Sequence, residues 1–77
     1  MMNMSEKQKF INKLKLEKDV YNNRIKEYKR RKLEVEESEK LTKTAKYLML
    51  MEFSDIIQYD LGKVKKIDKI IEDIILL

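Results

Sequence analysis

Apolar side chains recur along the chain at alternating spacings of three and four residues, which is the period of an amphipathic α-helix. In the first half the repeat forms a narrow seam in which six of eight members are apolar. Its members are Ile11, Leu14, Lys18, Tyr21, Ile25, Tyr28, Lys32 and Val35. In the second half only one member of the seam is polar. These members are Leu50, Phe53, Ile57, Asp60, Val64, Ile67, Ile71 and Ile74. The pattern predicts two long helices.

The repeat fails between residues 36 and 44, where a polar stretch separates the two halves. We therefore predict a single helical domain, with one helix over about residues 6–36, a turn over about 37–42 and a second helix over about 43–76. Because the polar stretch contains no strong helix breaker, one continuous helix is the alternative.

Local signals refine these boundaries. Ser5 followed by Gln8 forms a capping box and predicts the start of the first helix. Ser38 and Thr42 both fit as N-cap of the second helix. Gly62 costs about 1 kcal/mol relative to Ala inside a helix, which allows a bend in the second helix at that point.

The second half is apolar on more than one side, because another stripe of mostly apolar residues runs beside its seam at a spacing of seven. The stripe consists of Met49, Ile56, Lys63, Ile70 and Leu77. The narrow seam of the first helix cannot cover both stripes. We therefore predict an all-α fold, an antiparallel helical hairpin that self-associates into a coiled-coil-like bundle. The predicted interface with copies or with a partner is Met49, Leu50, Phe53, Ile56, Ile57, Val64, Ile67, Ile70, Ile71 and Ile74.

Composition supports assembly and argues against catalysis. The 77 residues include no Cys, His, Pro or Trp and a single Gly. The chain therefore has no disulfide, no thiolate nucleophile and no imidazole base or metal ligand. We predict a protein that is not an enzyme and that uses no cofactor or metal. A chain this short seldom derives more than about 3–5 kcal/mol from its own core, so oligomerisation is the remaining source of stability.

Acidic residues occur in clusters, but no nucleophile or second base lies beside them, and pairing with lysines three or four residues away accounts for most of them. Asp60 stands out because it occupies the second seam, where a buried carboxylate is costly unless it is paired. Two interpretations are open. Asp60 sets the register of the hairpin by pairing with Lys18 or Lys32, or it marks the point where the second helix leaves the first, near Gly62.

The charge is unevenly distributed. The net charge is +4, and residues 1–36 carry +5 against −1 for residues 37–77. Cations beside aromatic rings suit an anionic nucleotide, because the cations hold phosphate and the rings stack on bases. The candidate ligand-binding residues are Phe10, Lys13, Tyr21, Arg24, Lys26 and Lys29. The alternative is that Tyr21 and Tyr28 pack in the seam while the lysines form a solvated face.

Residues 17–28, EKDVYNNRIKEY, followed by a short polar link and residues 50–57, LMEFSDII, resemble the small phage anti-CBASS sponge proteins. That family consists of helical homo-oligomers that sequester cyclic-nucleotide signals and are not enzymes. The resemblance implies that Phe10 stacks on a base and that Lys26 contacts phosphate. Where the family often has a basic residue late in the second helix, this chain has Asp60.

The leading hypothesis is a non-enzymatic, phage-type anti-defence protein that captures an anionic nucleotide as a homo-oligomer. The alternative is an inhibitor or adaptor that binds a host or phage protein through the apolar face of the second helix. A third hypothesis is a basic helix that binds a nucleic-acid backbone. The longest uncharged run, residues 47–51, is far shorter than the roughly 20 residues that span a bilayer. We therefore expect no membrane association and a location in the cytoplasm, that of the host cell if the protein is phage-encoded.

Overall fold

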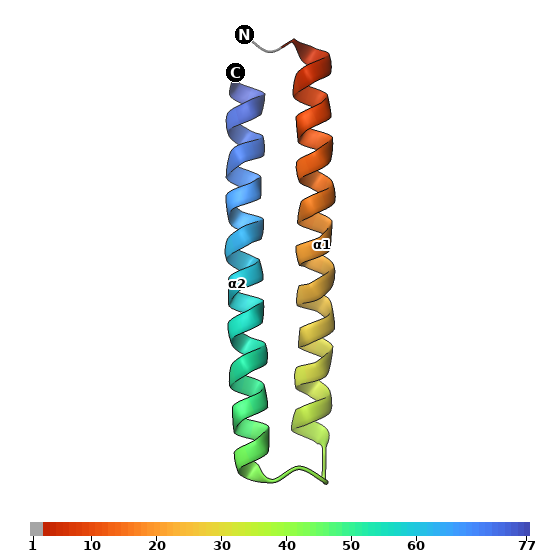
Figure 1. Ribbon diagram of the computed structural model, residues 1–77, viewed down its shortest axis with the longest axis vertical. Helices are drawn as coiled ribbons and strands as arrows, with labels where there is room; N and C mark the ends of the chain where they lie inside the picture. The colour runs from red at the N-terminus through yellow and green to blue at the C-terminus, as the bar shows by residue number, and fades with distance from the viewer. Residues whose placement is uncertain (1–2) are drawn as a thin grey trace.

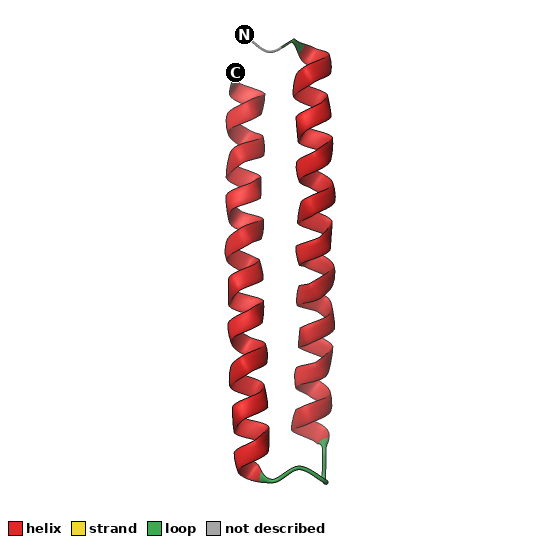
Figure 2. Cartoon of the chain, in the orientation of Figure 1, coloured by secondary structure: helices red, strands yellow, loops and turns green. Residues whose placement is uncertain are grey.

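The computed structural model describes residues 3–77, which form two antiparallel α-helices lying side by side (Figure 1). Helix α1 comprises Met4–Glu37 and helix α2 comprises Lys43–Leu76, 34 residues each. Residues 38–42 form the link, drawn as loop in Figure 2. The hairpin measures 58 × 14 × 10 Å, and the start of α1 lies beside the end of α2. The predicted all-α hairpin is confirmed, and the continuous-helix alternative is wrong.

The start of α1 differs from the prediction. Asn3 is the N-cap, and its Oδ1 accepts a hydrogen bond from the Glu6 N–H at 2.8 Å. Ser5 therefore lies inside the first turn, and its predicted capping role is wrong. Asn caps a helix as well as Ser does, so the earlier cap extends the helix by two residues.

The link contains both predicted caps, in different roles. Thr42 is the N-cap of α2, and its Oγ1 accepts from the Ala45 N–H at 3.1 Å. Ser38 instead ends α1, because its backbone is extended and its N–H donates to the Val35 carbonyl at 3.2 Å. Its Oγ accepts from the Lys40 N–H at 3.3 Å, which helps to turn the chain.

The two predicted seams face each other, and each of their sixteen members is buried or half-buried. Five apolar residues are buried, three on α1 and two on α2. They are Ile11, Ile25, Val35, Ile57 and Ile67. Near the link the rings of Tyr28 and Phe53 meet with centroids 5.3 Å apart at an angle of 59°. Such tilted aromatic pairs are stabilising by about 0.5–1.5 kcal/mol beyond the area they bury.

Gly62 does not interrupt α2, which continues as α-helix from Lys43 to Leu76. A bend at Gly62 is therefore absent. The seam on both sides of it packs against α1, and that packing outweighs the roughly 1 kcal/mol that a glycine costs inside a helix.

Candidate interaction surface

Asp60 is completely buried, with 0 % of its surface exposed, and it accepts two hydrogen bonds from Arg24 of α1. Arg24 Nε lies 2.7 Å from Asp60 Oδ2, and Arg24 Nη2 lies 2.5 Å from Asp60 Oδ1. The hydrogen bonds to Asp60 raise the pKa of the Arg24 guanidinium. Both interpretations of Asp60 are wrong, because its partner is neither Lys18 nor Lys32 and α2 stays packed on α1. The planar guanidinium matches both carboxylate oxygens, which an ammonium group cannot do.

Lys18, one of the two lysines in the α1 seam, has a different anionic partner. Its Nζ lies 2.6 Å from Asp68 Oδ1 on α2, and both side chains are partly exposed. Within residues 3–77, two ion pairs therefore cross the hairpin: one has a buried carboxylate, Asp60, and the other is partly exposed on both sides.

The six candidate ligand-binding residues all lie on α1 and do not converge. Phe10 and Lys29 are nineteen residues apart, which is about 28 Å along an α-helix. Lys13 and Lys26 are exposed, whereas Tyr21 is half-buried toward α2. A mononucleotide-sized ligand can therefore contact only some of these residues within one hairpin.

Two of the six are already engaged inside the hairpin. The Arg24 guanidinium is held by Asp60 and lies over the Tyr21 ring, with its Cζ 5.9 Å from the centroid. Tyr21 and Tyr28 are both half-buried in the seam, which agrees with the alternative prediction for these rings. The remaining candidates, Phe10, Lys13, Lys26 and Lys29, are exposed, and Phe10 has 47 % of its surface accessible.

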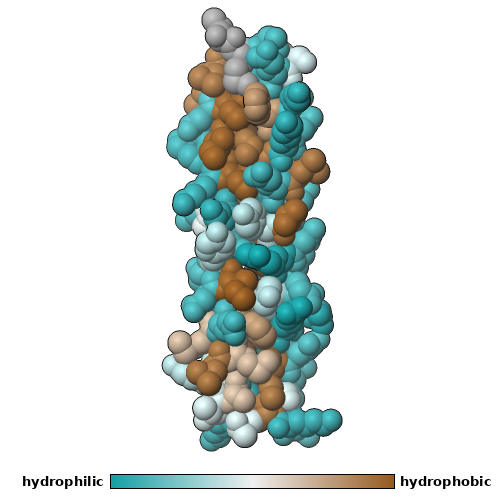
Figure 3. All heavy atoms as spheres, viewed as in Figure 1, coloured by the Kyte–Doolittle hydropathy of each residue, from teal (hydrophilic) through white to brown (hydrophobic). Residues whose placement is uncertain are grey.

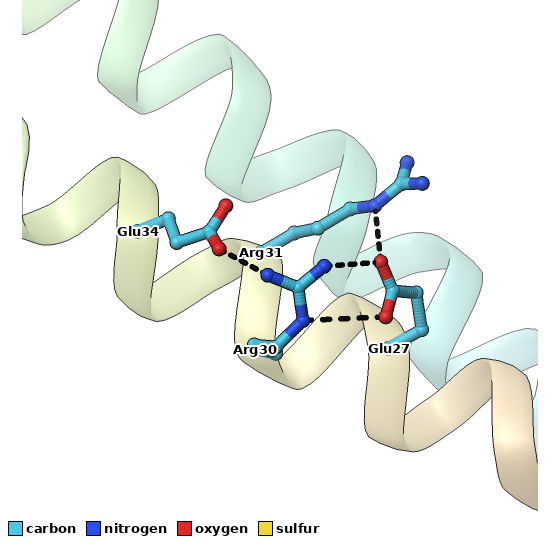
Figure 4. A network of polar contacts seen from close by, with 4 residues as sticks. All are labelled: Glu27, Arg30, Arg31 and Glu34. Carbon is cyan, nitrogen blue, oxygen red and sulfur yellow. Dashed lines mark hydrogen bonds and ion pairs between the residues drawn. The ribbon is translucent and has the colours of Figure 1, made fainter.

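The densest basic segment of α1 is partly neutralised by its own neighbours (Figure 4). Glu27 accepts from Arg30 Nη2 at 2.5 Å and from Arg31 Nε at 3.1 Å, and Arg30 also donates to Glu34. The hydrogen bonds from Arg30 and Arg31 lower the pKa of Glu27, and the bond to Glu27 raises the pKa of Arg30. Two carboxylates thus balance two guanidinium groups on one exposed face of α1. This segment therefore offers little net positive charge to the phosphates of a nucleic-acid backbone.

Apart from Asp60 and Asp68, which pair across the hairpin, the acidic residues that form ion pairs do so with a neighbour three or four residues away. The spacing of four residues joins Arg30 to Glu34 and Lys69 to Asp73, the latter at 3.2 Å. Within residues 3–77, no three acidic side chains come together in a way that could hold a metal ion.

Large apolar side chains are exposed mainly on α2. Among residues 3–77, eight of the fourteen exposed large apolar residues belong to α2, five belong to α1, and Leu77 directly follows α2. The eight are Tyr47, Leu48, Met51, Tyr59, Leu61, Ile70, Ile75 and Leu76. Figure 3 shows one face of the molecule, on which apolar groups gather chiefly toward the end where the two termini lie.

The predicted interface residues divide between the seam and the outside. Seven of the ten are the apolar members of the α2 seam, and they pack toward α1 inside one chain. They are Leu50, Phe53, Ile57, Val64, Ile67, Ile71 and Ile74. Met49 and Ile56 flank the seam and are half-buried, and Ile70 is 46 % exposed. The surface available to a partner therefore consists largely of residues outside the predicted set, such as Leu48 and Met51.

Helical spacing alone could have identified this outer surface. Tyr47, Met51, Gln58 and Leu61 are separated by three, four or seven residues, so they lie along one side of α2. These four positions are uncharged, and the charged residues Asp55 and Lys65 lie on the same side of α2. The seam pattern drew attention to the buried side of α2 instead.

A depression of about 200 Å³ lies at the open end of the hairpin. It is lined by Met4, Lys7, Gln8, Ile11 and Ile75. The lining contains one cation and no carboxylate, and its polar groups come from a single turn of α1. It offers an apolar wall and no constellation for chemistry.

Neither a protein-family model nor a curated protein nor a solved structure matches the chain. Within residues 3–77, neither helix combines the length and the apolar character needed to cross a membrane.

Proposed function

We propose that the protein is a non-enzymatic helical interaction module that works as a homo-oligomer assembled through α2. The observation that carries the proposal is the unequal outer surface, with eight exposed large apolar residues on α2 against five on α1. Exposed apolar area of this extent on a small chain is typical of a surface that binds another protein.

The size of the core supports the same proposal. Five apolar residues are buried in the hairpin, and a single core in a chain of this length seldom supplies more than about 3–5 kcal/mol. Association that covers α2 removes further apolar area from water, at roughly 25 cal/mol per Å². The oligomer is then the stable form of the chain.

Sedimentation equilibrium of the purified protein tests this function. We expect an oligomer whose population rises with concentration. Replacing Leu48 and Met51 together with Lys should dissociate it, because both side chains are exposed on α2 and both charges would have to be desolvated in the assembly.

A matched control replaces two exposed apolar residues of α1 with Lys, as the test variant does on α2. The control variant carries Leu16→Lys and Val20→Lys, whose parent side chains are 67 % and 66 % exposed. We expect this variant to remain oligomeric. A monomeric wild-type protein, or dissociation by both variants alike, contradicts assembly through α2.

Capture of an anionic nucleotide is the second candidate function, and the exposed basic residues of α1 favour it. Lys13, Lys26 and Lys29 are exposed and form no ion pair within residues 3–77, and Phe10 offers a half-exposed ring. Because these residues do not converge in one hairpin, the site would need side chains from two protomers. That requirement makes nucleotide capture dependent on assembly.

Calorimetric titration with cyclic di- and trinucleotides and with ADP-ribose tests the second candidate. We expect heat of binding that is abolished by Lys26→Ala together with Lys29→Ala. Arg30→Ala is the control, because Arg30 is held by Glu27 and Glu34. Absence of heat and of a thermal shift with all these compounds rules out nucleotide capture of this class.

A further inference from the structure

The side of α2 that points away from α1 contains a depression whose lining matches a helix-packing site. Its volume is about 370 Å³, and it is lined by Gln58, Leu61, Gly62 and Lys65, with the seam residue Val64 at its edge. Four of these residues stand at positions i, i+3, i+4 and i+7. In packed helices, such a group of four forms the hole that receives one side chain of a facing helix.

Gly62 creates this depression, and nothing inside the chain requires a glycine there. A Cβ built on Gly62 meets no atom within 4 Å, and the helix is continuous through it. Glycine is less favourable than Ala in a helix interior. Within one hairpin no contact compensates for this loss of helix stability. A partner helix could approach α2 closely at this point because Gly62 has no side chain.

The charges beside the depression select a second copy in the antiparallel direction. Asp55 and Lys65 are exposed and ten residues apart, which is about 15 Å along α2, so they cannot pair with each other. In an antiparallel pair of α2 helices with its two-fold axis at position 60, Asp55 of each copy lies opposite Lys65 of the other. A parallel pair would place like charges opposite each other.

The same two-fold axis also places a side chain of the other copy in the depression. Position 60 is midway between Gln58 and Gly62, so the arrangement that pairs the charges places Gln58 of each copy over the hole at Gly62 of the other. Gln58 is exposed and uncharged, and its amide has both donors and an acceptor for partners in the hole. Met51 and Leu48 then lie farther along the same contact, at the levels of Lys69 and Glu72 of the other copy.

We propose that two copies of this chain dock through the outer faces of α2, antiparallel about position 60, with Gln58 of each copy seated at Gly62 of the other and Asp55 paired with Lys65. The inference rests on the proposed assembly through α2 and specifies its geometry. The contact is isologous, as is usual for homodimers.

Charge reversal tests the pairing. Asp55→Lys and Lys65→Asp are each expected to weaken the dimer about tenfold in dissociation constant, because each change places like charges together at two symmetry-related contacts. The double variant with both changes should return to within about threefold of wild type. Since the two positions cannot meet inside one chain, this recovery reports a contact between copies.

Gly62→Gln tests the depression. The new side chain points into open space in one hairpin, so helix content by circular dichroism should be unchanged or higher, while the dimer weakens by about thirtyfold or more. Asn23→Gln on exposed α1 is the matched control and should leave the dissociation constant unchanged.

The outcomes separate this geometry from the proposed function. An oligomeric wild type whose dissociation constant is unmoved by Gly62→Gln, or single charge reversals that the double variant fails to rescue, overturn the position-60 contact and leave assembly through another part of α2 standing. A wild type that is monomeric overturns both. Weakening by Gly62→Gln with rescue by the double reversal supports the contact.

Discussion

Helices α1 and α2 have the same length and contribute equal seams to the hairpin, yet their outer surfaces differ. Both are 34 residues long, and each seam has eight buried or half-buried members. Outside the seam, α1 presents the network of Glu27, Arg30, Arg31 and Glu34, whereas α2 presents most of the exposed apolar residues. The seams therefore determine the hairpin, and the unequal outer surfaces are the basis of the proposed assembly through α2.

The Arg24–Asp60 pair is an exception to this difference between a charged α1 and an apolar α2. Here the apolar helix contributes a buried carboxylate, and the charged helix covers it with a side chain that is 46 % exposed. The two partners therefore differ. Arg24 can be hydrated when Asp60 is removed, whereas Asp60 stays buried when Arg24 is removed.

The largest expected effect comes from Arg24→Ala. The change leaves the Asp60 carboxylate buried without a partner, which is strongly destabilising, and Tm should fall by about 15 °C or more. Asp60→Ala should lower Tm by only about 5 °C, because Arg24 can be hydrated. Thermal unfolding at one fixed protein concentration measures both values. Equal losses in the two variants would show that the burial of the pair is symmetric.

Shortening one buried isoleucine on each helix should have the next largest effect. Ile25→Ala and Ile57→Ala each remove a side chain that is 6 % exposed, and each should cost about 2–4 kcal/mol in the free energy of unfolding. Urea denaturation measures the cost. Leu33→Ala, at a side chain that is 57 % exposed, is the control and should cost well under 1 kcal/mol. A large difference between Ile25 and Ile57 would contradict equal seams.

The sequence predicted the hairpin well because periodicity reports which side of a helix is buried. Every seam residue is buried or half-buried, including Lys18, whose long apolar stem lies in the seam while its ammonium group reaches Asp68. The turn was also located, since residues 38–42 are the link and Thr42 caps α2. The spacing of apolar residues indicates the buried side of each helix and the position of the turn without knowledge of individual side-chain contacts.

The partner of Asp60 was missed for a physical reason. Only Lys18 and Lys32, the polar members of the opposite seam, were considered, whereas Arg24 stands at the edge of the seam beside Ile25. A long side chain can reach into the seam from its edge. Which edge residue meets Asp60 depends on the stagger of the two helices, and composition does not determine that stagger.

The candidate site was less predictable than the fold. Phe10 and Lys29 were both predicted to bind the ligand because of their residue types. Residues on one helix lie close together only when they are three or four positions apart. The apolar character of α2 outside the seam was predicted, whereas the depression at Gly62 was not, because Gly62 was interpreted as a point where the helix can bend and Gln58 carries no charge. The depression between them depends on the absence of a side chain, which no periodic pattern records.

A smaller effect is expected from the exposed cross-helix ion pair. Lys18→Ala should cost about 0.5 kcal/mol in the free energy of unfolding, because both partners are partly exposed and screened by water. Urea denaturation at low and high salt measures the cost, which should shrink further as salt is added. A loss as large as that of Ile57→Ala would mean that this pair, like Asp60, is sealed from solvent.

The smallest effect concerns the outer network of α1 and is detected through pH. Hydrogen bonds from Arg30 and Arg31 hold the pKa of Glu27 below its ordinary value of 4.5 in the folded chain. The ionised carboxylate therefore stabilises the fold above pH 4.5, and that contribution is lost as pH falls through the lower folded pKa. The difference in Tm between wild type and Glu27→Gln should be small and positive at neutral pH and should vanish in strong acid. Glu17→Gln is the control, since Glu17 is exposed and forms no ion pair within residues 3–77. A difference for Glu27→Gln that persists unchanged in strong acid would assign its effect to packing on α1 rather than to charge.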